Sequence, residues 1–181
     1  MKNEIVISGF GGQGTLLAGV EIAQAALEQG LQTTWFPSYG AEMRGGTANS
    51  TVVVSDDEIG SPVVFSPNAL IALNELSLEK FSPRLVKGAV VIAPFKNKPA
   101  GDFNYFYVDV LDLAKQAGSL KAANMAAVGA LICALEKPDT VSITLDSLLL
   151  ACKKTFEKKP EFIGLNQKAI EAGYNFIKSQ K

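Results

Sequence analysis

The sequence has no histidine and only two cysteines, Cys133 and Cys152, among its 181 residues. The lack of histidine removes the usual general base near neutral pH, the commonest metal ligand and every Ser-His-Asp or Cys-His arrangement. Two thiols cannot supply the four ligands of an iron–sulfur cluster, and no Cys-x-x-Cys pair is present for redox exchange. Any electron carrier used with this chain is therefore expected on another polypeptide. Both cysteines lie in apolar stretches and are predicted to be core residues.

Neither sign of charge is in excess, because 17 Lys and Arg stand against 18 Asp and Glu. No positive field is available to draw the chain onto nucleic acid or an anionic membrane. The longest uncharged segments, 5–20 and 59–74, are interrupted by glycine or proline and fall short of the roughly 20 residues of a membrane-spanning helix. A strand pattern, not a signal-peptide core, follows Met1. The sequence therefore predicts a cytoplasmic protein with no nucleic-acid partner and no membrane span.

The composition, with 48% hydrophobic and 19% charged residues, is typical of one packed domain over residues 1–181. A β-branched run at 5–8, helical spacing at 15–29 and a strand pattern at 32–36 predict a β-α-β unit with parallel strands. Pro37 is expected to end the second strand. The β-rich stretch 47–55 follows too soon for a parallel crossover, so it is expected to run antiparallel to its neighbours.

Strands and helices alternate along the rest of the chain. The remaining expected strands are 70–73, 89–93 and 104–108, and the expected helices are 75–81, 111–117, 122–135, 145–156 and 161–177. This alternation predicts a three-layer α/β domain with a mostly parallel, mixed central sheet.

A glycine-rich turn, Gly-Phe-Gly-Gly-Gln-Gly at residues 9–14, lies between the first strand and the first helix. Glycine permits a tight turn and close backbone approach, and the free N–H groups of a helix start attract an anionic group. The acidic residue that holds a ribose hydroxyl about 20 positions later in dinucleotide-binding proteins is missing, because residues 33–37 read Thr-Thr-Trp-Phe-Pro. Three interpretations stay open: NAD or FAD binding, contact with another anion or a partner, and simple turn packing.

A second glycine-rich segment, Ser-Tyr-Gly-Ala-Glu-Met-Arg-Gly-Gly, occupies residues 38–46. This loop and the glycine turn are expected to leave the carboxyl ends of adjacent strands and to meet in space. Arg44 and Arg84 are the only arginines among the 17 basic residues. An arginine flanked by glycines in such a sequence favours a planar, bidentate partner, either Glu42 or a group on another chain. A solvent-exposed arginine in a turn is the alternative.

Several weaker features have ordinary structural explanations. The acidic run 56–58 is typical of a solvated turn, and a metal site formed by this run with Glu42 is the less favoured alternative. Asn124 and Asn166 lie near predicted helix starts in apolar surroundings. Capping or sheet-edge hydrogen bonding explains these two asparagines as well as a ligand does.

The turn at 9–14 together with the loop Pro-Ser-Tyr-Gly-Ala-Glu-Met-Arg-Gly-Gly at 37–46 resembles the gamma subunit of the 2-oxoacid:ferredoxin oxidoreductases. These enzymes decarboxylate a 2-oxoacid with thiamine diphosphate and load the acyl group onto coenzyme A. The similarity covers the whole chain, and the loop resembles the 2-oxoglutarate enzymes more than the pyruvate type. A pyruvate or branched-chain enzyme, a free-standing NAD- or FAD-binding oxidoreductase and a purely structural subunit are the alternatives.

The resemblance implies a Rossmann-like domain that packs on catalytic subunits, helps to form the coenzyme A site and is inactive alone. Thiamine diphosphate, Mg and [4Fe-4S] clusters would belong to the alpha and beta subunits, with a delta subunit left open, and electrons would pass to ferredoxin or flavodoxin. This chain would bind no cofactor alone and supply no catalytic residue. One departure from the family pattern is the segment 93–98, where a small polar loop is expected. The resemblance assigns contact with coenzyme A, another anion or a partner subunit to Gly9, Gly11, Gly12, Gln13, Gly14, Ser38, Tyr39, Glu42, Arg44, Gly45 and Gly46.

Overall fold

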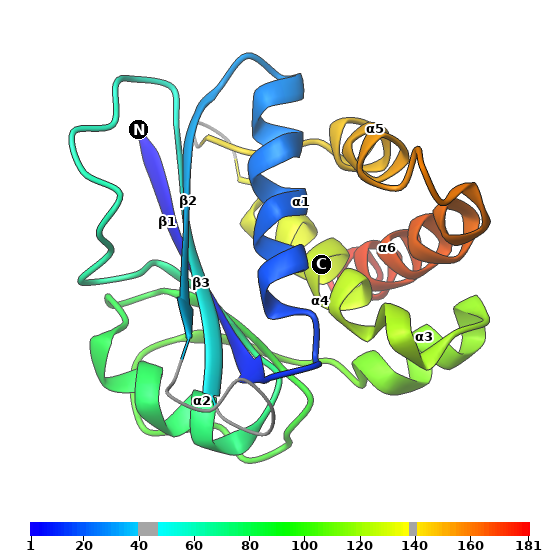
Figure 1. Cartoon of the computed structure of the whole chain (residues 1–181). Coiled ribbons are helices and arrows are strands. Elements are labelled where there is room, and N and C mark those ends of the chain that lie inside the picture. The colour runs from blue at the N-terminus through cyan, green and yellow to red at the C-terminus, as the bar shows by residue number, and fades with distance from the viewer. Residues whose placement is uncertain (40–46, 138–140) are drawn as a thin grey trace.

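The computed structural model describes residues 1–39, 47–137 and 141–181 (Figure 1). Its strands are β1 (Lys2–Phe10), β2 (Gln32–Tyr39), β3 (Thr47–Ser55), β4 (Ala69–Ala72), β5 (Val90–Ala93) and β6 (Asn104–Tyr107). Its α-helices are α1 (Thr15–Glu28), α2 (Glu75–Phe81), α3 (Val110–Ala117), α4 (Ala123–Leu135), α5 (Leu145–Thr155) and α6 (Ile163–Lys178). Short 3-10 helices follow α2 and precede α4 and α6, namely η1 (Ser82–Arg84), η2 (Leu120–Ala122) and η3 (Pro160–Phe162).

The strands form one mixed sheet in the order β2-β3-β1-β4-β5-β6. Strands β1, β4, β5 and β6 run parallel, whereas β3 runs antiparallel to both β1 and β2. The predicted α/β class, the mostly parallel mixed sheet and the antiparallel direction of 47–55 are therefore confirmed. The prediction that β1 and β2 are adjacent is wrong, because β3 lies between them and pairs with β1 along its whole length, from Lys2↔Ser55 to Phe10↔Thr47.

Two predicted strand ends are also wrong. Strand β2 continues through Pro37 to Tyr39, and β1 continues through Gly9 to Phe10. Strand β2 lies at the edge of the sheet, where a proline is tolerated because one side of the strand needs no N–H for the ladder. Strand β1 extends because β3 supplies a partner for each of its residues.

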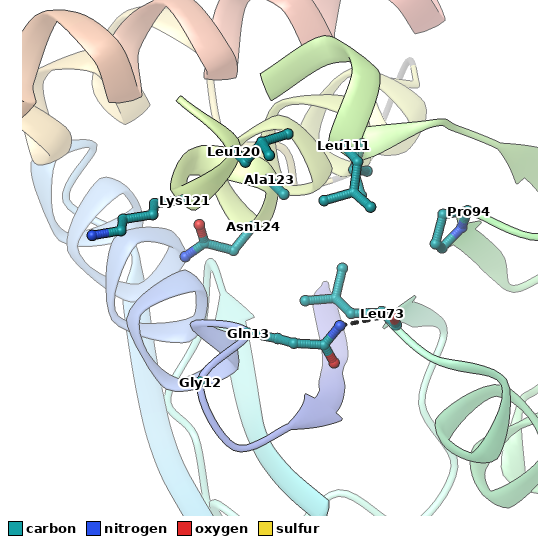
Figure 2. A pocket seen from close by; sticks show the side chains of 10 residues that line it. Gly12, Gln13, Leu73, Pro94, Leu111, Leu120, Lys121, Ala123 and Asn124 are labelled. Carbon is teal, nitrogen blue, oxygen red and sulfur yellow. Dashed lines mark hydrogen bonds between the residues drawn. The ribbon is translucent and has the colours of Figure 1, made fainter. Parts of the chain in front are cut away.

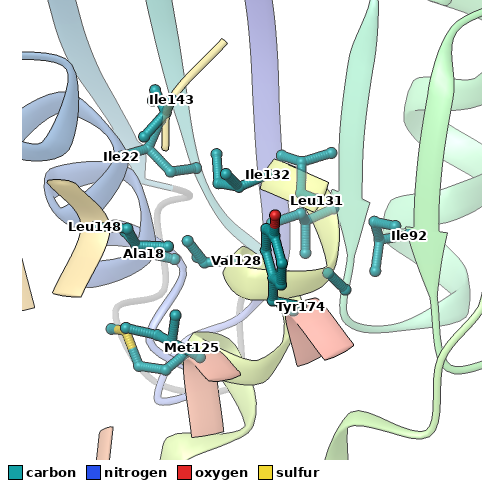
Figure 3. Packing of buried hydrophobic residues seen from close by; sticks show 14 of the residues in the cluster. Ala18, Ile22, Ile92, Met125, Val128, Leu131, Ile132, Ile143, Leu148 and Tyr174 are labelled. Atoms are coloured by element: carbon teal, nitrogen blue, oxygen red, sulfur yellow. The ribbon is translucent and has the colours of Figure 1, made fainter. Parts of the chain in front are cut away.

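The two faces of the sheet are covered unequally. Ile5 and Ile7 of β1 pack with α1 and α4 in the larger core, whereas Val6 packs with α2 and the segment around Val64 in a smaller one. Figure 3 shows the larger core from close by, with Ile22 of α1 near Val128 and Ile132 of α4. Helices α5 and α6 pack on α1 and α4, so the helical side is two helices deep (Figure 1). Helix α4 is buried almost all round, as expected for a helix without a polar face.

Helices α4 and α6 approach each other through glycines. A Cβ atom on Gly129 would lie 2.0 Å from the carbonyl oxygen of Ile170, and one on Gly173 would lie 1.9 Å from that of Ala126. These distances leave no room for any side chain at either position. The two helix backbones therefore meet directly, and this contact fixes α4 between the sheet and α6.

Candidate functional site

A pocket of about 300 Å³ opens at the carboxyl ends of β1, β4 and β5 (Figure 2). In the sheet, β2 and β3 lie on one side of β1, and β4, β5 and β6 lie on the other. The strand order therefore reverses at β1, and such a reversal is where ligands bind in open α/β sheets. Its polar lining comes from Gln13, Lys121 and Asn124. Its apolar walls are Leu73, Pro94, Val110, Leu111, Leu120 and Ala123. The segment 93–98, noted above as a departure, thus contributes Pro94 to one wall.

The glycine turn requires glycine for two different reasons. Gly12 and Gly14 have φ angles of +99° and +74°, in the left-handed region that other residues seldom adopt. Gly9 is needed for space, since a Cβ atom there would lie 2.7 Å from Oε1 of Gln13 and 3.2 Å from Cβ of Leu73. Gly11 is half-buried and borders a second hollow, which Thr15 and Ala48 also line.

The side chain of Gln13 closes the turn from within. Its Oε1 accepts a hydrogen bond from the Phe10 N–H at 2.6 Å, and its Nε2 donates to the Leu73 carbonyl at 3.2 Å (Figure 2). Asn74, which caps α2 by accepting from the Ser77 N–H at 2.8 Å, also donates to Gln13 at 3.4 Å. Both the oxygen and the nitrogen of the Gln13 carboxamide are thus used in hydrogen bonds that hold the turn against the end of β4.

A further asparagine holds the turn from the opposite side. Asn124, the second residue of α4, is 3% exposed, and its Nδ2 donates to the Gly14 carbonyl at 3.1 Å. The sequence marks Asn124 as a polar residue in an apolar segment but leaves open what it contacts. Neither this contact nor the hydrogen bond from Asn74 to Gln13 has a local sequence signal, because the partners are far apart along the chain.

Gly14→Ala is expected to lower the free energy of unfolding by at least about 2 kcal/mol, because strain at positive φ adds to a collision with Asn124. A Cβ atom on Gly14 would lie 2.5 Å from Asn124 Nδ2. Gly30→Ala is the matched control, since Gly30 has a φ of +72° but open space around it, and should cost about 1 kcal/mol. Chemical denaturation of both variants measures the difference, and equal losses would contradict the contact.

The first two residues of the predicted loop, Ser38 and Tyr39, end β2 at the same edge of the sheet as the glycine turn. Ser38 pairs with Asn49 of β3, and Asn49 pairs with Ser8 on its other side. The prediction that the two segments leave adjacent strands is therefore wrong, since a whole strand separates Ser38 from β1. The predicted meeting of the loop with the turn falls on residues outside the described ranges. Tyr39 ends β2 beside Ala48. The other loop residues predicted for the site lie outside the described residues, namely Glu42, Arg44, Gly45 and Gly46.

The family model described as pyruvate ferredoxin/flavodoxin oxidoreductase matches residues 4–176. The chain belongs to this family. The family resemblance predicted from the turn and the loop is thereby confirmed.

Relatives in the family carry several subunit names. Subunit VorA of ketoisovalerate oxidoreductase from Methanothermobacter marburgensis is 36% identical over 179 residues, which cover 96% of this chain and 36% of VorA. Subunit KorC of 2-oxoglutarate synthase from the same organism is 37% identical over 142 residues, which cover 72% of this chain and 76% of KorC. The crystal structure of a keto/oxoacid ferredoxin oxidoreductase gamma subunit from Geobacter sulfurreducens matches with a TM-score of 0.80 and 31% identity, covering 98% of this chain and 99% of that one. This chain thus spans about a third of the length of the VorA relatives.

The thiols of this oxidoreductase family member do not fit an iron–sulfur cluster. Cys133 and Cys152 are buried, which confirms the prediction that they are core residues. Burial raises the pKa of Cys133 and raises that of Cys152 to about 12, so both stay protonated near neutral pH, whereas a metal ligand must be a thiolate. Among the residues that the structure describes, no three His, Cys, Asp or Glu side chains are grouped to hold a metal ion. No helix within 1–39, 47–137 and 141–181 is long and apolar enough to cross a bilayer.

The strand order of this family member argues against the dinucleotide alternative. In dinucleotide-binding sheets the second strand lies beside the first and its end carries the acid for the ribose. Here β3 takes that place, and β2 has no acidic residue. Within the described residues, the glycine turn therefore has neither the neighbouring strand nor the carboxylate that dinucleotide-binding sheets place beside it.

Proposed function

We propose that this chain is the gamma subunit of a cytoplasmic 2-oxoacid:ferredoxin or flavodoxin oxidoreductase. Alpha and beta subunits of that complex would carry thiamine diphosphate, Mg and the [4Fe-4S] clusters and would convert the 2-oxoacid to an acyl-coenzyme A. The observation that carries the proposal is the end-to-end match with the Geobacter gamma subunit, which covers 98% of this chain and 99% of that one. Inactivity of the chain alone follows from this role.

The proposed substrate is 2-oxoglutarate. It is supported by the KorC relative, which is a 2-oxoglutarate synthase subunit, and by the Ser-Tyr-Gly-Ala-Glu-Met-Arg-Gly-Gly loop. A branched-chain 2-oxoacid is the second candidate, because the VorA relative of a ketoisovalerate enzyme matches 96% of this chain.

The contribution of this chain would be to position an anionic group near the chemistry. Helix α1 begins at the glycine turn with no side-chain cap and no acidic residue in its first turn, so its N–H groups favour a negative charge. Lys121 adds a cation at the pocket, whose apolar walls suit an uncharged portion of the same ligand. Coenzyme A, which supplies the thiol that accepts the acyl group, has both kinds of portion. A carboxylate of a partner subunit is the other anion that this arrangement fits.

The native complex provides the test. Purification with its partner subunits should yield thiamine diphosphate and iron, and the complex should reduce a viologen dye only with coenzyme A and a 2-oxoacid. Comparing kcat/KM for 2-oxoglutarate, pyruvate and 2-ketoisovalerate then assigns the substrate. Turnover by the isolated chain, or its binding of NAD or FAD at micromolar concentration, would contradict the proposal.

Arg44→Lys is expected to weaken coenzyme A saturation or complex assembly, because lysine keeps the charge but loses bidentate hydrogen bonding. Arg84→Lys is the matched control. The guanidinium of Arg84 donates to the Val64 carbonyl at 2.6 Å and to the Phe65 carbonyl at 3.3 Å, both within this chain, so Arg84→Lys should affect only stability. Steady-state kinetics and gel filtration of both variants measure the outcome. Unchanged coenzyme A saturation together with an intact complex would remove Arg44 from the site.

A further inference from the structure

Asn124 contacts the glycine turn at the peptide group that begins α1. The Gly14 carbonyl accepts two hydrogen bonds, one from the Ala18 N–H at 3.0 Å within α1 and one from Asn124 at 3.1 Å. The first bond is ordinary helix geometry and leaves the second lone pair of the oxygen free. Asn124, which belongs to the separate helix α4, donates its hydrogen bond to this second lone pair. The direction of this carbonyl is thus held from both α1 and α4.

Fixing the Gly14 carbonyl also fixes the first N–H group of the helix. The carbonyl of Gly14 and the N–H of Thr15 belong to one planar peptide group, so neither can rotate without the other. Gly14 has a φ of +74°, and glycine leaves this conformation easily because it has no side chain to restrict it. The hydrogen bond from Asn124 therefore adds to the helical bond from Ala18 in holding the peptide plane in one orientation.

The position of Asn124 in α4 explains why this bond is rigid. Asn124 is 3% exposed, and the residues that follow it in α4 are apolar and buried. Helix α4 is in turn held by the direct backbone contact of Gly129 with α6. The helix that carries this amide cannot shift without disturbing the core.

Asn166 provides an internal comparison. It also lies near a helix start, is 8% exposed and donates through Nδ2, but its acceptor is the Phe162 carbonyl of its own segment at 2.9 Å. Both asparagines line a hollow of about 190 Å³ between the starts of α4 and α6. The two residues therefore match in burial and chemistry and differ in whether they contact the turn.

From these contacts we infer that Asn124 is a positioning residue, which orients the first peptide group of α1 toward the anion that the glycine turn receives. This inference rests on the proposed function, in which that anion belongs to coenzyme A or to a partner subunit. The role of Asn124 is indirect, since the N–H groups of the turn and not its amide would meet the anion.

The test uses the assembled complex with Asn124→Asp, Asn124→Ala and the control Asn166→Ala. Asn124→Asp should raise the KM for coenzyme A roughly tenfold, because a carboxylate would face the Gly14 carbonyl and repel the anion. Asn124→Ala should raise this KM roughly fivefold, because one hydrogen bond is lost. In both variants kcat at saturating coenzyme A and the KM for the 2-oxoacid should stay within twofold of the unmodified complex. Asn166→Ala should leave all three parameters within twofold.

The outcomes separate this inference from the proposed function. No coenzyme A-dependent turnover by the unmodified complex would overturn the proposed function itself. Normal turnover combined with an unchanged KM for coenzyme A in Asn124→Ala would overturn the positioning role alone. If Asn124→Ala fails to assemble while Asn166→Ala assembles, Asn124 is structural, and the inference is likewise overturned. Calorimetric titration of the complex with coenzyme A should show the same roughly fivefold weakening in Asn124→Ala.

Discussion

Gly129→Ala is expected to lower the free energy of unfolding by about 3 kcal/mol. The new Cβ atom would lie 2.0 Å from the carbonyl oxygen of Ile170, and a backbone oxygen cannot move aside as a flexible side chain would. Alanine is the better helix former by about 1 kcal/mol, but this gain is smaller than the cost of separating α4 from α6. For a chain of this size the melting temperature should fall by roughly 10 °C, which thermal unfolding measures.

The chain offers a control for this substitution within α6. Gly164 is exposed, and a Cβ atom there would meet no other atom within 4 Å. Gly164→Ala should therefore raise the free energy of unfolding by about 0.5–1 kcal/mol through the lower entropy of the unfolded chain. If Gly129→Ala were as stable as Gly164→Ala, the two helices could not be packed backbone against backbone.

Helix α4 can be predicted from the sequence, but its position in the fold cannot. The apolar run at 122–135 predicts the helix, and the structure places α4 at Ala123–Leu135. A helix that is apolar all round has no polar stripe to indicate which side faces the sheet. Its position between the sheet and α6 depends on Gly129 and Gly173, whose role appears only when the two helices are seen together.

The strand order could not be predicted for a related reason. The short connection before 47–55 predicts an antiparallel strand, which is correct, but it contains no information on which neighbour the strand pairs with. Strand β3 pairs on both sides, and its insertion between β1 and β2 moves Ser38 away from the glycine turn. The length of a connection limits the direction of the next strand but not its place in the sheet.

The candidate site likewise depends on two kinds of residue, those within the glycine turn and those that reach it from distant parts of the sequence. The glycine turn was predictable because its geometry depends on residues within the turn, such as Gly12 at a φ of +99°. The residues that hold it are Asn74, which caps α2, and Asn124 of α4, and only the packing of those helices brings them to the turn. A sequence can mark such asparagines as unusual but cannot state their acceptors.

The last prediction concerns Glu21, a fully buried carboxyl group on α1. Neither of its oxygens has a hydrogen-bond partner among the described residues. Burial raises its pKa from the ordinary 4.5 to about 7, and the nearby Thr155 hydroxyl on α5 offsets only part of this rise. Glu21 is also one cause of the raised pKa of Cys152 on α5, which places the carboxyl group at the contact between these two helices.

A raised carboxyl pKa makes the folded state less stable as the pH rises. Below pH 4.5 Glu21 is protonated in both the folded and the unfolded chain and contributes no pH dependence. Between pH 4.5 and about 7 the unfolded chain releases the proton while the folded chain keeps it, so the free energy of unfolding falls. Above pH 7 the loss is complete and amounts to about 3 kcal/mol for a shift of this size.

Glu21→Gln keeps the shape of the side chain and removes its charge. At pH 8 the variant should be more stable than the unmodified chain by about 2 kcal/mol, because an amide is cheaper to bury than a carboxylate, whereas at pH 5 the two should be nearly equal. Urea unfolding of both proteins at pH 5, 6, 7 and 8 measures the difference, in which all other titrating groups cancel. Glu171→Gln on the exposed face of α6 is the matched control for the removal of one carboxyl group. A Glu21→Gln difference that stays constant across this range would mean that Glu21 is ionised in the folded chain throughout, and that a partner for its carboxylate exists at the α1–α5 contact.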